Sequence, residues 1–353
     1  MSNRLTQSSR AEQLGAYLLP GRSNEPLRAI TQAVAGEQAG LGSVWLSERA
    51  GTKDIATVGG ALAQATERVT IGAAVTHFQT RHPLVLASLG ITMQSLSNER
   101  FVLGVGRSIP ILWKAWGLPQ TTNQLLIDGV DLLRRLWTGE RVKYDGVLGT
   151  FPSMQLIDLP AVAPPPVLLA AIGPVSLRLA GEHFDGAILH PFLTPEAQQR
   201  AVDAIHEGAL GAGRDPKGIR IVATVVCAPD QSQEETDMRL RARLVTYLNS
   251  PGLAESLVKA NGWDLKVLDD VAAHPLIAPL GRRPADGTLD HAQLVEVSRV
   301  VPEEWFEQAA AAGTASEVAA RLSTYLDAGA DDIIIHGSPP DLLGATVDAV
   351  NAL

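Results

Sequence analysis

Four short segments of the sequence place small residues beside polar ones, a composition that suits a bound cofactor. Each segment follows an apolar run: Ser47-Glu48-Arg49, Ala74-Val75-Thr76-His77, Gly106-Arg107 and Ala170-Ala171-Ile172-Gly173-Pro174. Glycine and alanine let a flat ring or a phosphate approach the backbone amides closely. Carboxylate, imidazole and guanidinium groups add hydrogen bonds, charge and proton transfer. The four segments therefore form a candidate site if the fold brings them together.

The apolar runs alternate with segments of helical periodicity, which is the pattern of βα units around a parallel sheet. Eight strands are predicted, within LGAYLLP, SVWLSE, VTIGAAVTH, FVLGVG, PVLLAAIG, GAILHP, IRIVATVVCAP and DDIIIHG. Eight such units predict an α/β fold, the TIM (β/α)8 barrel, in which the carboxyl ends of the strands carry the active site. The four candidate segments end strands two to five, so we expect them on one face.

Two segments interrupt the alternation within what we predict to be one barrel domain, residues 1–353. A predicted helix from Asn123 to Trp137 leads into VKYDGVLGTFPSMQL, whose turn residues indicate a hairpin, so residues 140–163 are expected to form an excursion. Residues 231–305 combine helical periodicity with a Pro- and Gly-rich stretch, and they are predicted to be an insertion over one barrel face.

The composition argues against several classes of protein. The chain has 353 residues, 46% of them hydrophobic, and no apolar run approaches the ~18 residues of a membrane span. A net charge of −9 disfavours a nucleic-acid partner, which needs clustered Lys and Arg. Cys227 is the single cysteine, and its apolar surroundings predict an inert core thiol. Because the N-terminal segment is polar and lacks secretory-signal features, we expect a cytoplasmic protein with no membrane partner.

Several segments together resemble one known family. HPLVLASLGITMQSLSNERFVLGVGRS resembles the signature that joins the third and fourth strands in the bacterial luciferase-like monooxygenase superfamily, and LLAAIGPVSLRLAGEHFDGAIL is similar to its fifth strand, helix and sixth strand. Matching features run from Leu14 to His190 and return at DAGADDIIIHG. GVGRSIPILWKAWGLP and YDGVLGTFP resemble the branch that uses the deazaflavin coenzyme F420. The resemblance implies hydride exchange between F420 and a small organic substrate, with the coenzyme carrying the difficult step.

The resemblance also assigns roles to the candidate segments. It implies a bulge in strand three with a non-prolyl cis peptide at Ala74-Val75, against which the ring lies. Thr76 and His77 would border the ring, and Gly106 and Arg107 would approach the ribityl or phosphate part. The residues implied to line the phosphate, at the start of the following helix, are Ala170, Ala171, Gly173 and Pro174. Related barrels often dimerise, so a homodimer is expected.

The end of strand two departs from the family pattern. Many deazaflavin enzymes have Ser-Asp-His there, whereas this chain has Ser47-Glu48-Arg49, so a permanent cation replaces the imidazole. Ser47 and Glu48 are still expected to contact the coenzyme. Two roles stay open for Glu48: a hydrogen-bond acceptor that orients the ring, with a part in catalysis, or an ion-pair partner of Arg49 or Lys53.

His77 is the other catalytic candidate, since an imidazole that titrates near neutrality could move a proton beside the ring. A structural role for His77 remains the alternative. His82, before Pro83, is expected to cap a helix or enter the core. His190 and His336 also end strands on the active face, but no metal-ligand spacing accompanies them, so no metal site is predicted.

The stretch RFVLGVGRSIPILWKAWG also raises alternatives. Gly104 and Gly106 are expected to clear space for the coenzyme, and Arg107 to contact its anionic arm. The stretch does not complete the GxGxxG fingerprint, so a nicotinamide fold is disfavoured. Trp113 and Trp116 lie one helical turn apart and either roof the substrate pocket or pack the loop onto the barrel.

Two other functions compete with the F420 reading. The first is an FMN-dependent monooxygenase that uses reduced flavin from a reductase partner. The second is a protein that binds the flavin or deazaflavin without turnover, which the altered Ser47-Glu48-Arg49 segment keeps open.

Overall fold

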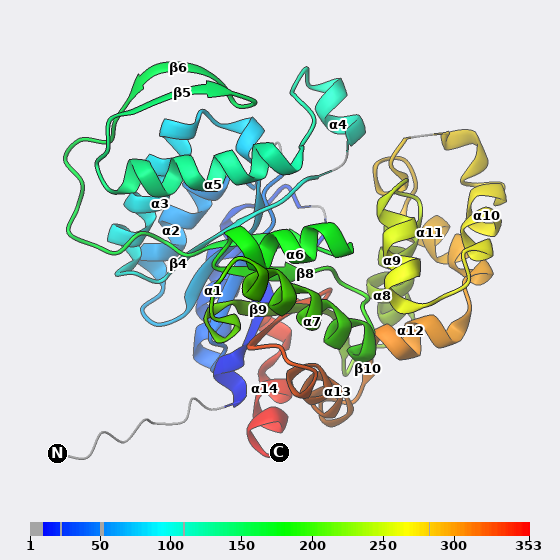
Figure 1. The fold of residues 1–353 in the computed structure, drawn as a ribbon. Coiled ribbons are helices and arrows are strands. Elements are labelled where there is room, and N and C mark those ends of the chain that lie inside the picture. Colours follow the sequence, from blue (N-terminus) through cyan, green and yellow to red (C-terminus); the bar gives the residue numbers. More distant parts are fainter. Residues whose placement is uncertain (1–9, 22, 50–52, 109, 282) are drawn as a thin grey trace.

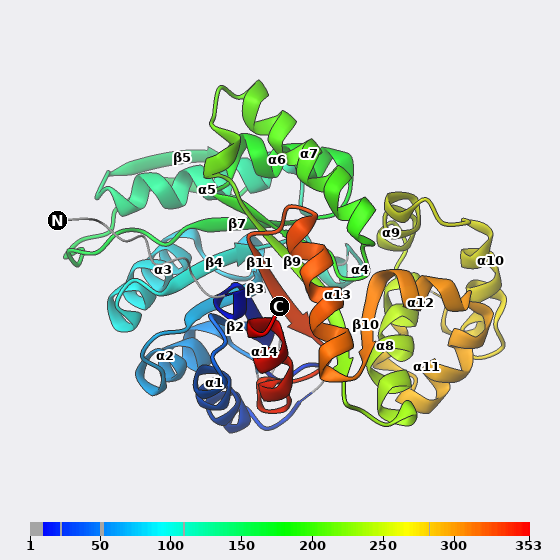
Figure 2. The same ribbon diagram turned by 90° about the horizontal axis from the view of Figure 1, so that it is seen from below.

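Eight parallel strands close into a barrel in the computed structural model, which describes residues 10–353 except 22, 50–52, 109 and 282. The order around the barrel is β1-β2-β3-β4-β7-β8-β9-β11, and β11 pairs back with β1 (Figure 1, Figure 2). The barrel strands are β1 (Leu14–Tyr17), β2 (Ser43–Leu46), β3 (Thr70–Thr76), β4 (Phe101–Val105), β7 (Val167–Ala171), β8 (Gly186–Leu189), β9 (Arg220–Pro229) and β11 (Asp332–His336). All eight predicted strands and the TIM-barrel fold are confirmed.

Helices surround the barrel, as the alternating pattern predicts (Figure 2). The helices that follow barrel strands are α1 (Leu27–Ala39), α2 (Ile55–Ala65), α3 (Pro83–Ser97), α4 (Pro110–Ala115), α5 (Asn123–Trp137), α6 (Pro174–His183), α7 (Pro195–Gly211), α13 (Ala315–Asp327) and α14 (Gly344–Asn351). Local chemistry sets their starts: the side chains of Asp54 and Thr122 accept hydrogen bonds from first-turn amides of α2 and α5. The predicted helix from Asn123 to Trp137 has those same bounds.

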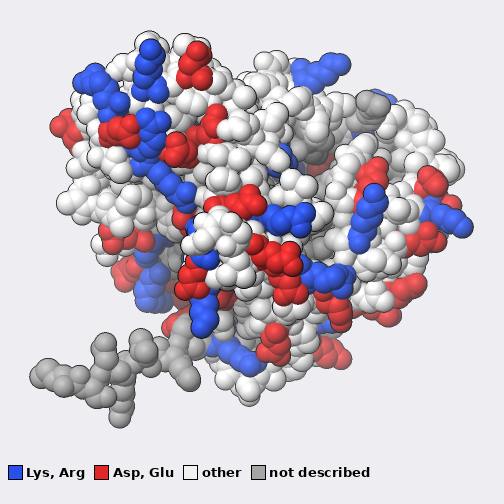
Figure 3. All heavy atoms as spheres, viewed as in Figure 1, with Lys and Arg blue, Asp and Glu red and all other residues white. Residues whose placement is uncertain are grey.

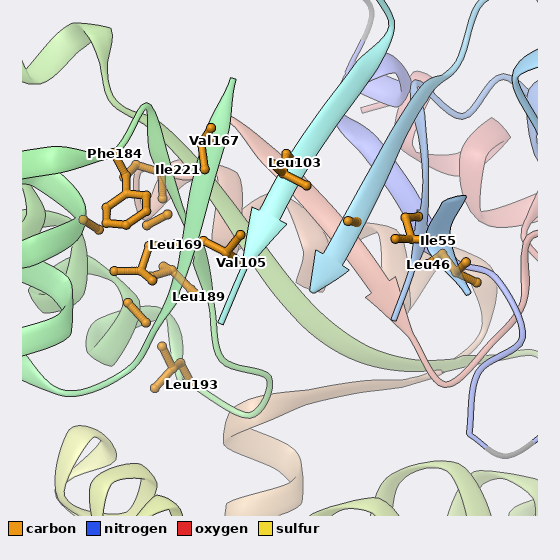
Figure 4. Close-up of a cluster of buried hydrophobic side chains, with 14 of the residues drawn as sticks. Leu46, Ile55, Leu103, Val105, Val167, Leu169, Phe184, Leu189, Leu193 and Ile221 are labelled. Carbon is orange, nitrogen blue, oxygen red and sulfur yellow. The ribbon is translucent and has the colours of Figure 1, made fainter. Parts of the chain in front are cut away.

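The core has an inner and an outer part. Inside the barrel, each strand contributes at least one side chain to a small cluster, which comprises Tyr17, Trp45, Ala74, Val75, Val102, Leu168, Ile188, Val222 and Ile334. Outside it, alternate residues of the strands pack against the helices, and Figure 4 shows Leu103, Val105, Val167, Leu169 and Leu189 in this cluster. Cys227 is fully buried in β9, and burial raises the pKa of its thiol, as expected for an inert core residue.

Two additions extend the barrel. An antiparallel hairpin, β5 (Val142–Gly146) and β6 (Gly149–Met154), lies between α5 and β7, within the residues expected to form an excursion. A helical lobe follows β9 and lies beside the barrel in Figure 1. It comprises α8 (Gln233–Leu248), α9 (Leu253–Asn261), α10 (Lys266–Ala273), α11 (His291–Val297) and α12 (Glu303–Ala309), and it returns through β10 (Ala310–Gly313), which pairs with the end of β9.

The surface in Figure 3 mixes Lys and Arg with Asp and Glu and has no broad basic patch on the face shown. Within the described part of the chain, none of the helices has both the length and the apolar character needed to span a membrane.

The glycines of β4 bring this strand against β3. A Cβ on Gly104 would stand 2.1 Å from the carbonyl oxygen of Ala73 and 2.7 Å from Ile188 Cδ1, and a Cβ on Gly106 would stand 2.6 Å from Val75 Cγ2. The space at the Cβ positions of these glycines is therefore filled by the neighbouring strands, and their expected role beside the coenzyme stays a prediction.

Replacing Gly104 with alanine should lower the free energy of unfolding by about 3 kcal/mol, because the added methyl group meets rigid backbone rather than a flexible side chain. Gly60, inside α2, is the matched control, since nothing lies within 4 Å of the position of its Cβ. Gly60→Ala should raise stability by about 0.5–1 kcal/mol. Urea denaturation measures both, and equal stability of Gly104→Ala and the wild type would refute this account of β4.

Candidate active site

A cleft of about 1020 Å³ opens where β2 and β3 end. Its lining includes three of the predicted strand-end segments or their neighbours: Ser47, Glu48 and Arg49; Ala74, Val75 and His77; and Ser108. The peptide bond between Ala74 and Val75 is cis, as predicted, and the pairing of β3 with β4 shifts register between Ala73 and Thr76. The volume is at the upper end of the range of small-molecule sites, about 300–1,000 Å³.

Glu48 is held in the wall of this cleft by Arg81. The guanidinium of Arg81 donates to both carboxylate oxygens of Glu48, and it also donates to Asp54 Oδ2 at 2.6 Å. The Thr76 hydroxyl and the backbone amide of Ile55 donate to the same carboxylate. The oxygens of Glu48 therefore already accept hydrogen bonds from four donor atoms, which belong to three groups.

The expectation that Glu48 pairs with Arg49 or Lys53 is wrong. Arg49 instead lies 3.7 Å from Asp286, and Lys53 donates to backbone carbonyls. Arg81 and Glu48 are 33 residues apart in the sequence. They meet because the chain turns back after β3.

His77 lines the cleft as a neutral imidazole. Burial lowers its pKa to about 4; the nearby Glu48 opposes the shift and Arg81 adds to it. The expectation that His77 titrates near neutrality is wrong, and its ring can offer only hydrogen bonds at pH 7. Its ring packs edge-on against Trp113, with centroids 4.9 Å apart.

The two tryptophans of the α4 segment have different positions. Trp113 is 1% exposed, and its indole N–H donates to the carbonyl of Arg107 at 2.7 Å. Trp116 is 46% exposed and lines the cleft. Trp113 therefore packs the loop onto the barrel, as one alternative expected. The other alternative, a roof over the substrate pocket, stays a prediction for Trp116.

Arg107 and the β7–α6 segment are not among the residues that line the cleft. The Arg107 guanidinium donates to the Thr121 carbonyl and to Asn123 Oδ1, so it anchors the start of α5. Gly173 caps α6 without a side-chain hydrogen bond, and the position of its Cβ has no neighbour within 4 Å. First-turn amides at this open helix start would suit an anion. The assignment of Gly106, Arg107, Ala170, Ala171, Gly173 and Pro174 to the coenzyme stays a prediction.

Three further histidines, His82, His190 and His336, have structural or buried positions. His82 caps α3, accepting from the Leu84 amide at 3.2 Å, as expected. Burial lowers the pKa of His190 to about 4 and that of His336 well below its usual range. Among the residues whose positions are described, no three His, Cys, Asp or Glu side chains gather as metal ligands would.

Three residues of the site were missed at the level of sequence. Arg81 pairs with Glu48; Tyr17, at the end of β1, donates to the carbonyl of Ala74 at 2.9 Å; and Gln79 lines the cleft with a buried amide oxygen that has no partner among the described residues. Tyr17 is the last residue of β1, and its place at a strand end could have identified it as a candidate site residue. Arg81 and Gln79 lie in the irregular segment between β3 and α3. The periodicity of the sequence does not predict the path of such a segment.

A barrel with one large cleft across the ends of its second and third strands defines a small-molecule enzyme of the (β/α)8 class. The family model for luciferase-like monooxygenases matches residues 5–332. The chain belongs to the luciferase-like monooxygenase family and is an oxidoreductase of that family.

Relatives of this chain include F420-dependent enzymes. It is 26% identical to the 5,10-methylenetetrahydromethanopterin reductase of Methanolobus tindarius over 90% of this chain and 92% of the relative. It is 27% identical to the F420-dependent glucose-6-phosphate dehydrogenase of Amycolatopsis mediterranei over 90% of each chain. The solved coenzyme F420 dependent tetrahydromethanopterin reductase of Methanopyrus kandleri superposes with a TM-score of 0.76 at 20% identity, covering 96% of each chain, and this likeness shows the fold.

Replacing Arg81 with methionine should lower the free energy of unfolding by about 3 kcal/mol, because it leaves the Glu48 carboxylate buried and unpaired. The two side chains are 13% and 11% exposed. The control is Arg299→Met, which breaks an exposed pair with Glu296 and should cost less than about 1 kcal/mol. Denaturant titrations measure the free energy of unfolding of both variants. Equal losses of stability would show that the buried Arg81 pair contributes no more than an exposed one.

Stability should fall as the pH is lowered from 6.5 to 4. His77 and His190 have pKa values of about 4 in the fold. An unfolded histidine has a pKa near 6.5, so the unfolded chain binds more protons in this window and gains stability relative to the fold on acidification. His77→Gln removes one of these groups, and its free energy of unfolding should depend less steeply on pH. Parallel curves for the variant and the wild type between pH 4 and 6.5 would contradict a buried neutral His77.

Proposed function

We propose that this protein is an F420-dependent oxidoreductase that transfers hydride between the deazaflavin coenzyme and a small organic substrate. The observation that carries the proposal is the cleft against the β3 bulge, where Ala74, Val75 and His77 meet the end of β2. A relative named as F420-dependent, which the alignment covers over 90% of each chain, supports the choice of coenzyme.

The residues present fit a flat heteroaromatic ring. Val75 and Ala74 give the cleft an apolar floor, and the free amide oxygen of Gln79 offers an acceptor to a ring N–H. Trp116, which lines the same cleft, would cover the ring. The start of α6, with Ala170, Ala171, Gly173 and Pro174, would hold the phosphate of the coenzyme. When bound, F420 supplies a carbon that gives or takes hydride.

The chain's own residues position and shield the reactants. The Arg81–Glu48 pair and the Tyr17 hydroxyl fix the ends of β1, β2 and β3 around the cleft, which keeps the reacting atoms at a constant distance. The neutral imidazole of His77 orients the ring or the substrate by a hydrogen bond. Because burial keeps His77 uncharged at neutral pH, we assign it to positioning rather than to acid catalysis.

An FMN-dependent monooxygenase supplied by a reductase partner is the second candidate, since the family as a whole is named for such enzymes. A third candidate is a protein that binds the coenzyme without turnover. For the preferred function we propose a cytoplasmic homodimer, as expected from the sequence.

Titration of the purified protein with F420 and with FMN, side by side, tests the proposal. Quenching of the coenzyme's fluorescence should report binding of F420 at least ten times tighter than that of FMN. Tighter binding of FMN would favour the monooxygenase. Tight binding of F420, with no oxidation of its reduced form by any member of a broad carbonyl and imine panel, would favour the non-catalytic protein.

Gly106→Leu should weaken F420 binding by at least tenfold, about 1.4 kcal/mol, because its side chain displaces Val75 from the cleft floor. Gly218→Leu is the control, since open space surrounds Gly218 in the short turn before β9. The same fluorescence titration, with circular dichroism to check the fold, measures the effect. Unchanged affinity in a folded Gly106→Leu protein would remove Val75 from the coenzyme site.

A further inference from the structure

A second, smaller cavity adjoins the cleft. We call it the basic chamber: a space of about 220 Å³ whose lining includes Tyr17, Gly21, Lys53, Arg243, Tyr247 and His336. The basic chamber and the cleft are neighbours, because they share the lining residues Ser47, Arg49, Pro284 and Asp286. The chamber lies where β1, β2 and β11 end and is closed on its other side by α8 of the helical lobe.

Two cations meet at one loop of this chamber. The Lys53 side chain is 3% exposed, and its ammonium group donates to the carbonyls of Leu19 and Gly21, the latter at 2.6 Å. Arg243 Nη2 stands 3.3 Å from the position of a Cβ on Gly21. Burial lowers the pKa of Lys53 to about 8, with further lowering by the positive charges of Arg49 and Arg243. Arg243 thus lies close enough to Lys53 for the two charges to repel.

Little negative charge offsets these cations. Three cations, Arg49, Lys53 and Arg243, line the chamber, and Asp286 is the one carboxylate in its lining. Asp286 lies 3.7 Å from Arg49, whereas Lys53 and Arg243 have no ion pair with any described Asp or Glu. Of the three, Lys53 is buried, whereas Arg243 is partly exposed and Arg49 is exposed. Three cations beside one carboxylate leave an excess of positive charge that would attract an anionic group.

Two neutral side chains, His336 and Tyr17, also line the chamber. His336 Nδ1 is buried and has no hydrogen-bond partner among the residues described. Burial and the surrounding cations keep His336 neutral, so one of its ring nitrogens carries a proton that can be donated. The Tyr17 ring packs edge-on against His336 at 4.9 Å, and the Tyr17 hydroxyl donates to the carbonyl of Ala74. Tyr17 thus connects the chamber directly to the bulge in the cleft.

We propose that the basic chamber binds an oxyanion group of the substrate, so that the substrate is an organic carboxylate or phosphate ester. Arg243 and Lys53 hold the oxyanion, and the remainder of the substrate reaches into the cleft toward Ala74 and Val75. The inference rests on the proposed function in one respect: the cleft holds the coenzyme that reacts with the part of the substrate lying there.

Binding of small anions to the F420-loaded protein tests this inference. The probes are inorganic phosphate and acetate, with acetamide as the uncharged match for acetate, and isothermal titration calorimetry measures their affinities. Either phosphate or acetate should bind at least ten times tighter than acetamide. The tighter of the two identifies the anion as a phosphate or a carboxylate. Acetamide-like affinity for both anions would overturn the proposal.

Arg243→Gln should weaken the binding of the preferred anion at least tenfold while F420 affinity changes less than twofold. Arg241→Gln is the matched control on the same helix, because Arg241 pairs with Asp237 and Glu303 away from the chamber. It should bind the anion as the wild type does. Wild-type anion affinity in Arg243→Gln would overturn the proposal.

Two outcomes separate this inference from the proposed function. If Arg243→Gln loses F420 affinity but keeps its affinity for the deazaflavin fragment without phosphate, the chamber holds the coenzyme's tail, and the substrate proposal is wrong. If F420 does not bind the wild type, yet phosphate or acetate binds in an Arg243-dependent way, the proposed coenzyme is wrong while the anion site stands.

Discussion

The ion pair between Glu48 and Arg81 is the interaction on which the candidate site depends. Glu48 follows β2 and Arg81 follows β3, so the pair ties together the ends of two adjacent barrel strands. Both side chains are largely buried, and a buried pair is tolerated only when its remaining donors and acceptors are satisfied. The Thr76 hydroxyl, the Ile55 amide and Asp54 meet that condition. The wall of the cleft is consequently fixed by electrostatics as well as by packing.

This arrangement limits the chemistry that the cleft can perform. The Glu48 carboxylate is paired with the Arg81 guanidinium, and His77 stays neutral because it is buried. His77 is therefore not charged at neutral pH. Hydride transfer to or from a bound coenzyme needs alignment and the exclusion of water above all, which a rigid, partly apolar cleft supplies. The electrostatics of the wall are thus consistent with the oxidoreductase class of the family.

The fold could be predicted from the sequence because each unit carries its own local signal. Apolar runs marked all eight strands, and the α5 bounds follow from the Thr122 cap and the apolar periodicity up to Trp137. The cis peptide at Ala74-Val75 came from family resemblance. Contacts that depend on loops were not predictable in this way. The partner of Glu48 required the path of residues 77–82, and the packing of Gly106 against Val75 required the register of β3 beside β4.

The segment at the end of β2 lines both the cleft and the basic chamber. Glu48 turns toward Arg81 in the wall of the cleft, whereas Arg49 lies against Asp286, where the cleft meets the basic chamber. An imidazole in the place of Arg49 could exchange a proton near neutral pH, but a guanidinium keeps its charge and cannot. Substitution of arginine for histidine therefore exchanges a possible acid for a fixed positive charge. Lys53 and Arg243 line the same chamber, so Arg49 belongs to a group of cations at this side of the barrel mouth.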